Sequence, residues 1–314
     1  MRAARRSGGS TVAADAHEWR KQTIVNLVRE ASVELSARDR LAEAMCREFL
    51  APGTRIYINF AANDSYHQTV EAAIRLKRAG FVPVPHVAAR YLIGFTQLDD
   101  LLARLSGEAG VEQVLAIGGD LDQPAGPYHS SLELLETGLF AKRGIRTVGI
   151  AGYPEGHLRI SEAQLDAALR AKLAIVARDG LTPYIVTQFC FEAAPILSWI
   201  DRTRAAGIAA PVRIGLAGPA SIATLAKYAV RCGIGHSIRA LARGHASLAR
   251  LLVESGPELL IDQLAAAASP GMAGLHFFAF GGLARTGRWF QAAARGAITF
   301  AEGDGFKVNP GGTT

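Results

Sequence analysis

The chain has 314 residues, 49% of them hydrophobic and 20% charged, with a formal net charge of +6 and a pI near 9.4. This composition predicts one large domain or two small ones with an ample core. Because no apolar run reaches the ~20 residues that a membrane span needs, and because the basic residues form no single stripe, we expect an anionic small molecule as ligand and neither membrane nor nucleic acid as partner.

The two ends of the chain and its cysteines limit the domain organisation. The first fourteen residues lack acids and show no clear amphipathic helix, so we expect residues 1–20 to be a disordered arm rather than a transit peptide. We expect residues 21–300 to form the catalytic domain and residues 301–314 a C-terminal tail. Cys46, Cys190 and Cys232 lie far apart without metal-ligand spacing, which predicts neither a metal site nor disulfides and favours the cytoplasm.

Apolar, strand-like runs recur along the chain. The first two, residues 31–35 and 55–60, are separated by a helical pattern over residues 38–49. Five further runs follow helical patterns that end at a glycine, which is typical of a left-handed helix cap. These glycines are Gly80, Gly110, Gly144, Gly180 and Gly207, and the runs are residues 81–87, 111–117, 145–151, 181–187 and 208–216. An eighth run, residues 275–280, follows Gly274.

Helix start signals lie between these runs. The expected caps are Asp64 or Ser65, Thr96 with Asp99, and Ser161 with Gln164. Between Cys232 and Ser269 the rhythm breaks, and we expect inserted helices around residues 238–242, 245–253 and 259–268. Non-alternating strands separated by helices predict an α/β protein, a (β/α)₈ TIM barrel with extra helices before the last strand. A doubly wound open sheet is the alternative.

Polar residues gather where the expected strands end. Since the C-terminal ends of barrel strands form one mouth that holds the chemistry, these residues are candidate site residues. They are Glu34, Asn59, Asn63, His86, Arg90, Gly118–Asp120, Tyr153–His157, Thr187, Gln188, Gly215, Gly218 and Arg285. Taken alone, Asp120 is more typical of a turn residue or helix cap, and His86 is more typical of a hydrogen-bonded core histidine. The expected gathering of all these polar residues at the C-terminal end of one barrel favours an active site.

Several of these segments resemble motifs of the methylenetetrahydrofolate reductases. Residues 152–157 (GYPEGH) resemble the family signature YPE-x-H, and residues 187–192 (TQFCFE) are similar to the strand end TQFFFD. Residues 118–120 (GGD), 85–87 (PHV) and 276–278 (HFF) resemble RGD, PHLT and HFY. The order of the motifs matches, and the resemblance covers about residues 32–289. The first two motifs in this order are specific.

The resemblance implies a role for each matching residue. Glu34 would be the general acid of folate ring opening, and Asp120 would stabilise the cationic iminium. Gln188 would contact the folate pterin, and we group Arg285 with it as substrate-binding. The cofactor-binding residues would be Asn59, His86, Gly119, Tyr153, His157, Asp166 and Lys172. Family members use NADH or NADPH, usually with bound FAD that relays the hydride.

The sequence also departs from the family pattern. Gly118 replaces the arginine before Gly-Asp, Ser36 and Ala37 replace two prolines after Glu34, and Leu169 lies nearest to the expected asparagine. Because contacts to the flavin are lost, we expect FAD to be absent or weakly held. Direct hydride transfer from NADH to folate then becomes an alternative to the flavin relay.

The chemistry fits this interpretation. An acid near folate N10 helps the ring to open, and a fixed carboxylate near N5 stabilises the developing cation. We therefore expect Glu34 to be the carboxyl that can be protonated and Asp120 the one that stays ionised. Two other functions remain open: a folate-dependent one-carbon transferase, and a non-catalytic folate-binding subunit. In each case we expect a tetrahydrofolate derivative as ligand and a homo-oligomer.

Overall fold

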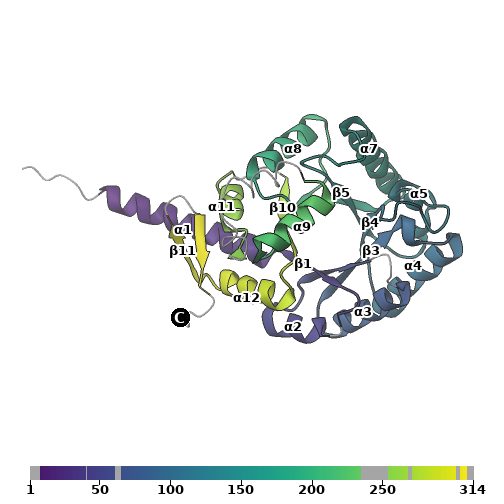
Figure 1. Ribbon diagram of the computed structural model, residues 1–314, viewed down its shortest axis with the longest axis horizontal. Coiled ribbons are helices and arrows are strands. Elements are labelled where there is room, and N and C mark those ends of the chain that lie inside the picture. Colours follow the sequence, from purple (N-terminus) through teal and green to yellow (C-terminus); the bar gives the residue numbers. More distant parts are fainter. Residues whose placement is uncertain are drawn as a thin grey trace, which may run out of the picture.

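Eight parallel strands close into a barrel in the computed structural model, which describes residues 8–39, 41–60, 65–234, 254–267, 271–301 and 305–309 (Figure 1). The strand order around the barrel is β1-β10-β7-β6-β5-β4-β3-β2. The bounds are β1 (Ser32–Ser36), β2 (Arg55–Asn59), β3 (Val82–Ala88), β4 (Gln113–Ile117), β5 (Thr147–Gly152), β6 (Thr182–Thr187), β7 (Val212–Ala217) and β10 (Met272–Phe278). Closure confirms the TIM barrel and excludes the open sheet.

Helices surround the barrel and connect its strands. They are α2 (Ala42–Phe49), α3 (Tyr66–Arg78), η1 (Ala89–Tyr91), α4 (Phe95–Ala109), α5 (Ser131–Glu136), α6 (Leu139–Lys142), α7 (Glu162–Arg178), α8 (Ala193–Ala205), α9 (Ile222–Cys232), α11 (Glu258–Ala267) and α12 (Leu283–Ala294). A short antiparallel pair, β8 (Ala220–Ser221) and β9 (Glu254–Ser255), lies beside α9. None of the described helices is both long and apolar enough to cross a membrane.

The predicted helix ends are largely confirmed. All five glycines that follow a helix have positive φ, and Ser65 and Ser161 form capping boxes with Gln68 and Gln164. The box expected at Thr96 is wrong, because α4 already begins at Phe95 and Asp99 pairs with Arg143 instead. The helix expected at 259–268 is α11, whereas those at 238–242 and 245–253 lie outside the described residues.

Both ends of the chain are more structured than expected. Helix α1 (Gly8–Arg29) runs through much of the segment that we expected to be a disordered arm. It is held because Ile24 and Val28 are fully buried and because Arg20 pairs with Asp262 of α11. The expected tail contains β12 (Gly305–Val308), which pairs with β11 (Ile298–Ala301) and buries Phe306.

Strand register decides which side chains meet inside the barrel. In the β1–β10 pair Ser32 lies opposite His276, and in the β1–β2 pair Ser36 lies opposite Asn59. A small apolar cluster fills the barrel interior and contains Tyr57, Val84, Leu115, Tyr184 and Val186. The larger core lies between the strands and the surrounding helices. The polar groups at the strand ends therefore lie above this packed apolar cluster.

Candidate active site

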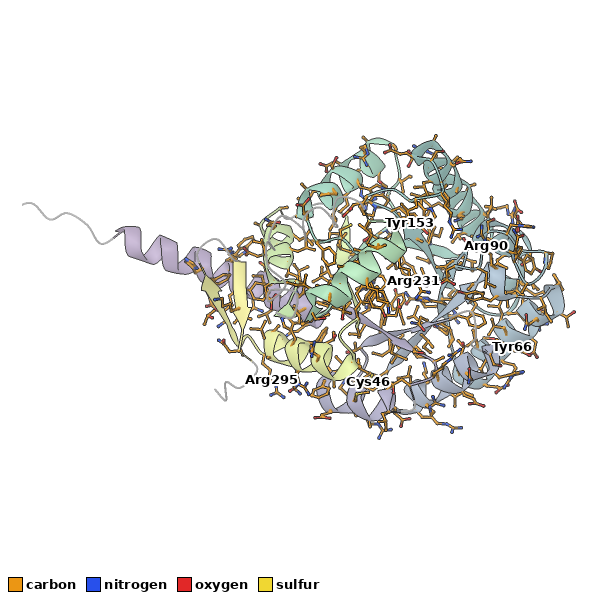
Figure 2. All side chains as sticks on the ribbon, viewed as in Figure 1. Cys46, Tyr66, Arg90, Tyr153, Arg231 and Arg295 are labelled. Atoms are coloured by element: carbon orange, nitrogen blue, oxygen red, sulfur yellow. The ribbon has the colours of Figure 1, made fainter. Side chains whose placement is uncertain are left out.

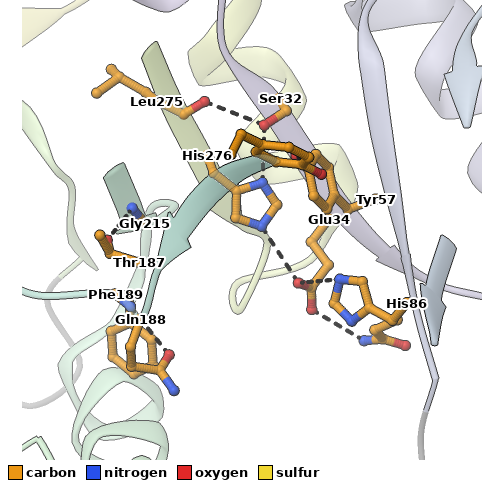
Figure 3. A network of polar contacts seen from close by, with 12 residues as sticks. Ser32, Glu34, Tyr57, His86, Thr187, Gln188, Phe189, Gly215, Leu275 and His276 are labelled. Carbon is orange, nitrogen blue, oxygen red and sulfur yellow. Dashed lines mark hydrogen bonds and ion pairs between the residues drawn. The ribbon is translucent and has the colours of Figure 1, made fainter. Parts of the chain in front are cut away.

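Glu34 is the centre of a buried polar cluster near the end of β1 (Figure 3). Its Oε1 accepts a hydrogen bond from Nδ2 of Asn59 at 3.4 Å. Its Oε2 lies 3.6 Å from Nε2 of His86 and 3.5 Å from Nε2 of His276. The partners come from β2, β3 and β10, so the barrel joins residues that are up to 242 positions apart in the sequence.

Two contacts other than the one with Glu34 hold the ring of His276 in place. Its Nδ1 lies 3.0 Å from the Ser32 hydroxyl, and the ring of Tyr57 packs against it at a centroid distance of 4.4 Å. Among the described residues, Oδ1 of Asn59 and the Nε2 atoms of both histidines are buried without a hydrogen-bond partner. Because buried polar atoms are normally paired, a polar ligand is well suited to satisfy them.

The pKa values show which charges this cluster favours. Burial raises the pKa of Glu34, but His86, His276 and Asn59 outweigh it and leave the pKa below its ordinary value. Burial lowers the pKa of His86 despite the carboxylate beside it. At neutral pH the cluster therefore holds an ionised Glu34 and an uncharged His86. Glu34 must therefore take up a proton before it can act as an acid.

Asp120 follows β4 and is held by two partners from other elements. The hydroxyl of Tyr91, in η1 after β3, donates to its Oδ1, and Nη2 of Arg231, in α9, donates to its Oδ2 at 2.6 Å. Burial raises the pKa of Asp120, yet these two hydrogen bonds outweigh it and keep the pKa low. Burial and the bond to Asp120 raise the pKa of Tyr91 to about 12. Asp120 is thus an anion at neutral pH.

The two expected substrate-binding residues lie at other strand ends. Gln188 follows β6, and its Oε1 accepts a hydrogen bond from the backbone N–H of Phe189 at 3.1 Å (Figure 3). The Thr187 hydroxyl accepts a hydrogen bond from the N–H of Gly215 at 2.8 Å, which ties the ends of β6 and β7 together. Arg285 is half-buried in the first turn of α12. The structure therefore spreads these residues around the mouth rather than clustering them.

A cavity of about 310 Å³ lies beside the mouth, between the end of β5 and helices α7 and α8. Tyr153 and Asp166, both expected cofactor ligands, line it. The other charged residues in its wall are Glu155, Glu162 and Arg202, and Arg202 pairs with Glu162 at 3.6 Å. Three carboxylates therefore face one arginine in this cavity.

The remaining cofactor candidates do not assemble around this cavity. The His157 ring is edge-on to Tyr153 at 5.4 Å, and burial lowers the pKa of Lys172, which lies farther along α7. Gly119 has a φ of +90° and lies against Tyr91, while His86 and Asn59 belong to the Glu34 cluster. A flavin diphosphate needs basic groups, and the described lining is mostly acidic. This cavity therefore fits the FAD diphosphate poorly.

Three residues of the site carried no assignment from the sequence. His276 lies in the HFF segment, but its contact with Glu34 depends on barrel closure. Tyr91 and Arg231 meet Asp120 from 29 and 111 positions away. No local spacing could have indicated either contact, since both depend on how loops and α9 fold over the barrel. Asn63, another strand-end candidate, lies outside the described residues.

The chain was compared with known protein families and with curated proteins. Residues 40–282 match the family described as methylenetetrahydrofolate reductase. The chain is similar to methylenetetrahydrofolate reductase 1 of Schizosaccharomyces pombe, with 28% identity over 134 residues, 38% of this chain and 20% of that protein. It is also similar to 5,10-methylenetetrahydrofolate reductase of Pectobacterium carotovorum, with 26% identity over 187 residues, 57% of this chain and 58% of that protein. The matches thus span less than two thirds of either relative.

A solved structure also resembles this chain. Dihydropteroate synthase from Thermus thermophilus gives a TM-score of 0.48 at 14% sequence identity. The superposition covers 82% of this chain and 90% of that chain.

Proposed function

The chain belongs to the methylenetetrahydrofolate reductase family, and we propose that it reduces 5,10-methylenetetrahydrofolate to 5-methyltetrahydrofolate with NADH or NADPH as the hydride donor. One observation supports this proposal above the others. Two carboxylates with different surroundings stand at strand ends of one barrel: Glu34, buried between two histidines, and Asp120, partly exposed to solvent. Ring opening followed by hydride addition needs such a pair.

Glu34 is suited to the ring-opening step. The bond between the bridging carbon and N10 breaks, N10 takes up a proton, and the carbon remains on N5 as a cationic iminium. Glu34 delivers that proton. Because the carboxyl is ionised at neutral pH in this cluster, it must first take up a proton, and the imidazoles of His86 and His276 are close enough to exchange one with it. Ser32 keeps the His276 ring in the orientation that this exchange requires.

Asp120 is suited to the second step. A carboxylate fixed before the reaction starts stabilises the positive charge that develops on N5, without the cost of reorienting water. Tyr91 holds Oδ1 of Asp120 and so sets the direction in which the carboxylate points. Gln188 offers an amide to the edge of the pterin. A reduced nicotinamide supplies the hydride when it is bound, and the carbon becomes a methyl group.

We propose further that FAD is absent or weakly held. The replacement of the family's arginine by Gly118 and the acidic lining of the cavity beside Tyr153 both support this. The purified protein should therefore be colourless. A yellow protein that keeps near-stoichiometric flavin through gel filtration, with absorbance near ~450 nm, would contradict this part of the proposal.

The proposed reaction is tested by the consumption of reduced nicotinamide. We expect the absorbance of NADH or NADPH to fall only when 5,10-methylenetetrahydrofolate is present, with 5-methyltetrahydrofolate as the product by chromatography. Unchanged absorbance with both donors, with and without added FAD, would exclude the reductase function. Methyl or one-carbon transfer without nicotinamide oxidation would indicate a transferase, and folate binding without any turnover a binding subunit.

A further inference from the structure

Helix α9 lies across the C-terminal mouth of the barrel (Figures 1 and 2). Its Tyr228 stacks on Phe280, just beyond β10, with ring centroids 4.0 Å apart and an interplanar angle of 15°. Its Leu225 is buried in an apolar cluster that includes Phe189, which follows β6. The last turn of the helix carries Arg231, which reaches the loop after β4. One helix therefore spans the ends of three barrel strands.

The end of this helix lies close enough to both candidate catalytic carboxylates for their charges to reach it. Burial raises the pKa of Cys232, the last residue of α9, and the charges of Glu34 and Asp120 contribute to the increase while Arg231 opposes it. Cys232 is therefore within electrostatic reach of both carboxylates.

The contact between Arg231 and Asp120 conflicts with the role proposed for Asp120. A carboxylate already paired with a guanidinium stabilises a second positive charge less, because the two cations compete for one anion. The side chains are 66% and 54% exposed, however, so water screens the pair and little free energy holds it together. Tyr91 keeps its hydrogen bond to the other oxygen and orients Asp120 whether or not Arg231 is present.

We propose that Arg231 masks Asp120, and that its exposed guanidinium is displaced when folate binds, which frees the carboxylate for the iminium. Arg231 is thus a gating residue and Tyr91 a positioning residue. This inference rests on the proposed function, because that function gives Asp120 its cationic target. The exposed ion pair is displaced at low cost, whereas the Tyr91 contact persists.

Hydrogen–deuterium exchange tests the contact between Arg231 and Asp120 and does not require the enzyme to turn over substrate. Arg231→Gln and Asp120→Asn should each speed amide exchange in the last turn of α9 by about two- to fivefold, the range that an exposed ion pair supports. The double variant should add nothing further, because both changes remove the same contact. Two controls should leave the exchange rate near that of the wild type. Lys227→Gln removes the same charge from another exposed position on the helix. Arg231→Lys keeps the positive charge at the position itself. Unchanged exchange in Arg231→Gln, or equal effects of Arg231→Gln and Lys227→Gln, would overturn the mask.

Kinetics test the consequence for the reaction. With NADH and 5,10-methylenetetrahydrofolate, Arg231→Gln should raise kcat/KM by about two- to fivefold. Added salt should raise the wild type toward that level and leave the variant unchanged, because ions screen the masking pair. A fall in kcat/KM in Arg231→Gln would instead show that Arg231 assists the substrate, and would overturn the proposal. If no variant turns over but exchange changes as described, the mask stands and the proposed reductase function fails.

Discussion

The two carboxylates of the site differ most in their contact with water. The Glu34 side chain is 13% exposed and that of Asp120 is 54% exposed. A buried carboxylate depends on its protein partners for charge stabilisation, whereas an exposed one shares that task with solvent. Substitutions at Glu34 should therefore alter proton transfer to the folate. Substitutions at Asp120 should alter the stabilisation of the folate iminium cation.

We predict that Asp120→Asn lowers kcat about 10²-fold or more and changes the folate Kd much less. Asparagine keeps the size and a hydrogen-bonding oxygen but loses the charge that stabilises the iminium, and such an interaction is strongest in the transition state. Steady-state kinetics and equilibrium binding measure the two effects. Asp122→Asn is the matched control, because Asp122 lies on the same loop and pairs with Arg159. Near-native turnover of Asp120→Asn would make Asp120 a turn residue.

The pH dependence of turnover follows from the lowered pKa of Glu34. His86, His276 and Asn59 hold the pKa of Glu34 below its ordinary value near 4.5, so the protonated acid is a small fraction at neutral pH. That fraction falls about tenfold for each unit of rising pH. We predict that kcat/KM falls steadily between about pH 6 and pH 8, and that Glu34→Gln removes this slope along with most activity. A flat wild-type profile would contradict Glu34 as the acid.

Gln188 should act on affinity rather than on rate. Its amide carries no charge, and its Oε1 accepts a hydrogen bond from the Phe189 N–H, so it can bind the pterin edge but cannot stabilise a cation. We predict that Gln188→Ala raises the folate Kd about tenfold, the scale of one or two hydrogen bonds, with kcat changed little. Isothermal titration with tetrahydrofolate and steady-state kinetics separate the two. A loss confined to kcat would rule out this role.

At the scale of elements, close backbone approach positions the strand ends. A Cβ added to Gly215 in β7 would lie 2.3 Å from the carbonyl oxygen of Thr187 at the end of β6. The backbones of β6 and β7 therefore approach so closely there that a residue with a Cβ atom would clash. Gln188 is the residue directly after Thr187. The identity of this glycine thus supports the geometry of the substrate-binding side of the mouth.

We predict opposite effects for two glycine-to-alanine changes. Gly215→Ala should lower the free energy of unfolding by about 1–3 kcal/mol through overpacking and should also raise the folate Kd by shifting Gln188. Gly107→Ala, inside α4 with no atom within 4 Å of the added Cβ, should raise the free energy of unfolding by about 0.5–1 kcal/mol and leave binding unchanged. Urea denaturation measures both. Equal effects at the two positions would show that the close approach at Gly215 is unimportant.

At the scale of the whole molecule, the ends of the chain complete the outer layer of the barrel. The hairpin of β11 and β12 packs beside α11 and α12, and α1 lies against both of these helices. Phe306 of β12 is 1% exposed, and its ring lies 6.4 Å from that of Trp289 in α12. The segment expected to be a tail is therefore part of the fold.

We predict that Phe306→Ala lowers the free energy of unfolding by about 3–5 kcal/mol, because it removes a fully buried aromatic ring and leaves a cavity. The matched control is Lys307→Ala, at the adjacent exposed position of the same strand, which should change stability by less than about 0.5 kcal/mol. Thermal and urea denaturation give the comparison. If the two variants proved equally stable, the hairpin would not contribute to the core.

The sequence by itself determined the barrel and the strand ends that bear its polar residues. Glycine caps and non-alternating apolar runs are local signals, so the rhythm of strand and helix could be predicted from them. Glu34, Asp120 and Gln188 were recognisable because they lie next to those signals or within family motifs. The family itself was predicted from the same motifs.

Only the tertiary structure decided what these side chains contact. The pairing of Glu34 with His276 depends on the closure of β1 against β10, and the pairing of Asp120 with Arg231 depends on α9 lying across the mouth. The placement of α1 and of the β11–β12 hairpin likewise comes from packing against α11 and α12. Such contacts join residues more than a hundred positions apart, and their stability comes from burial and charge in three dimensions, which no local pattern encodes.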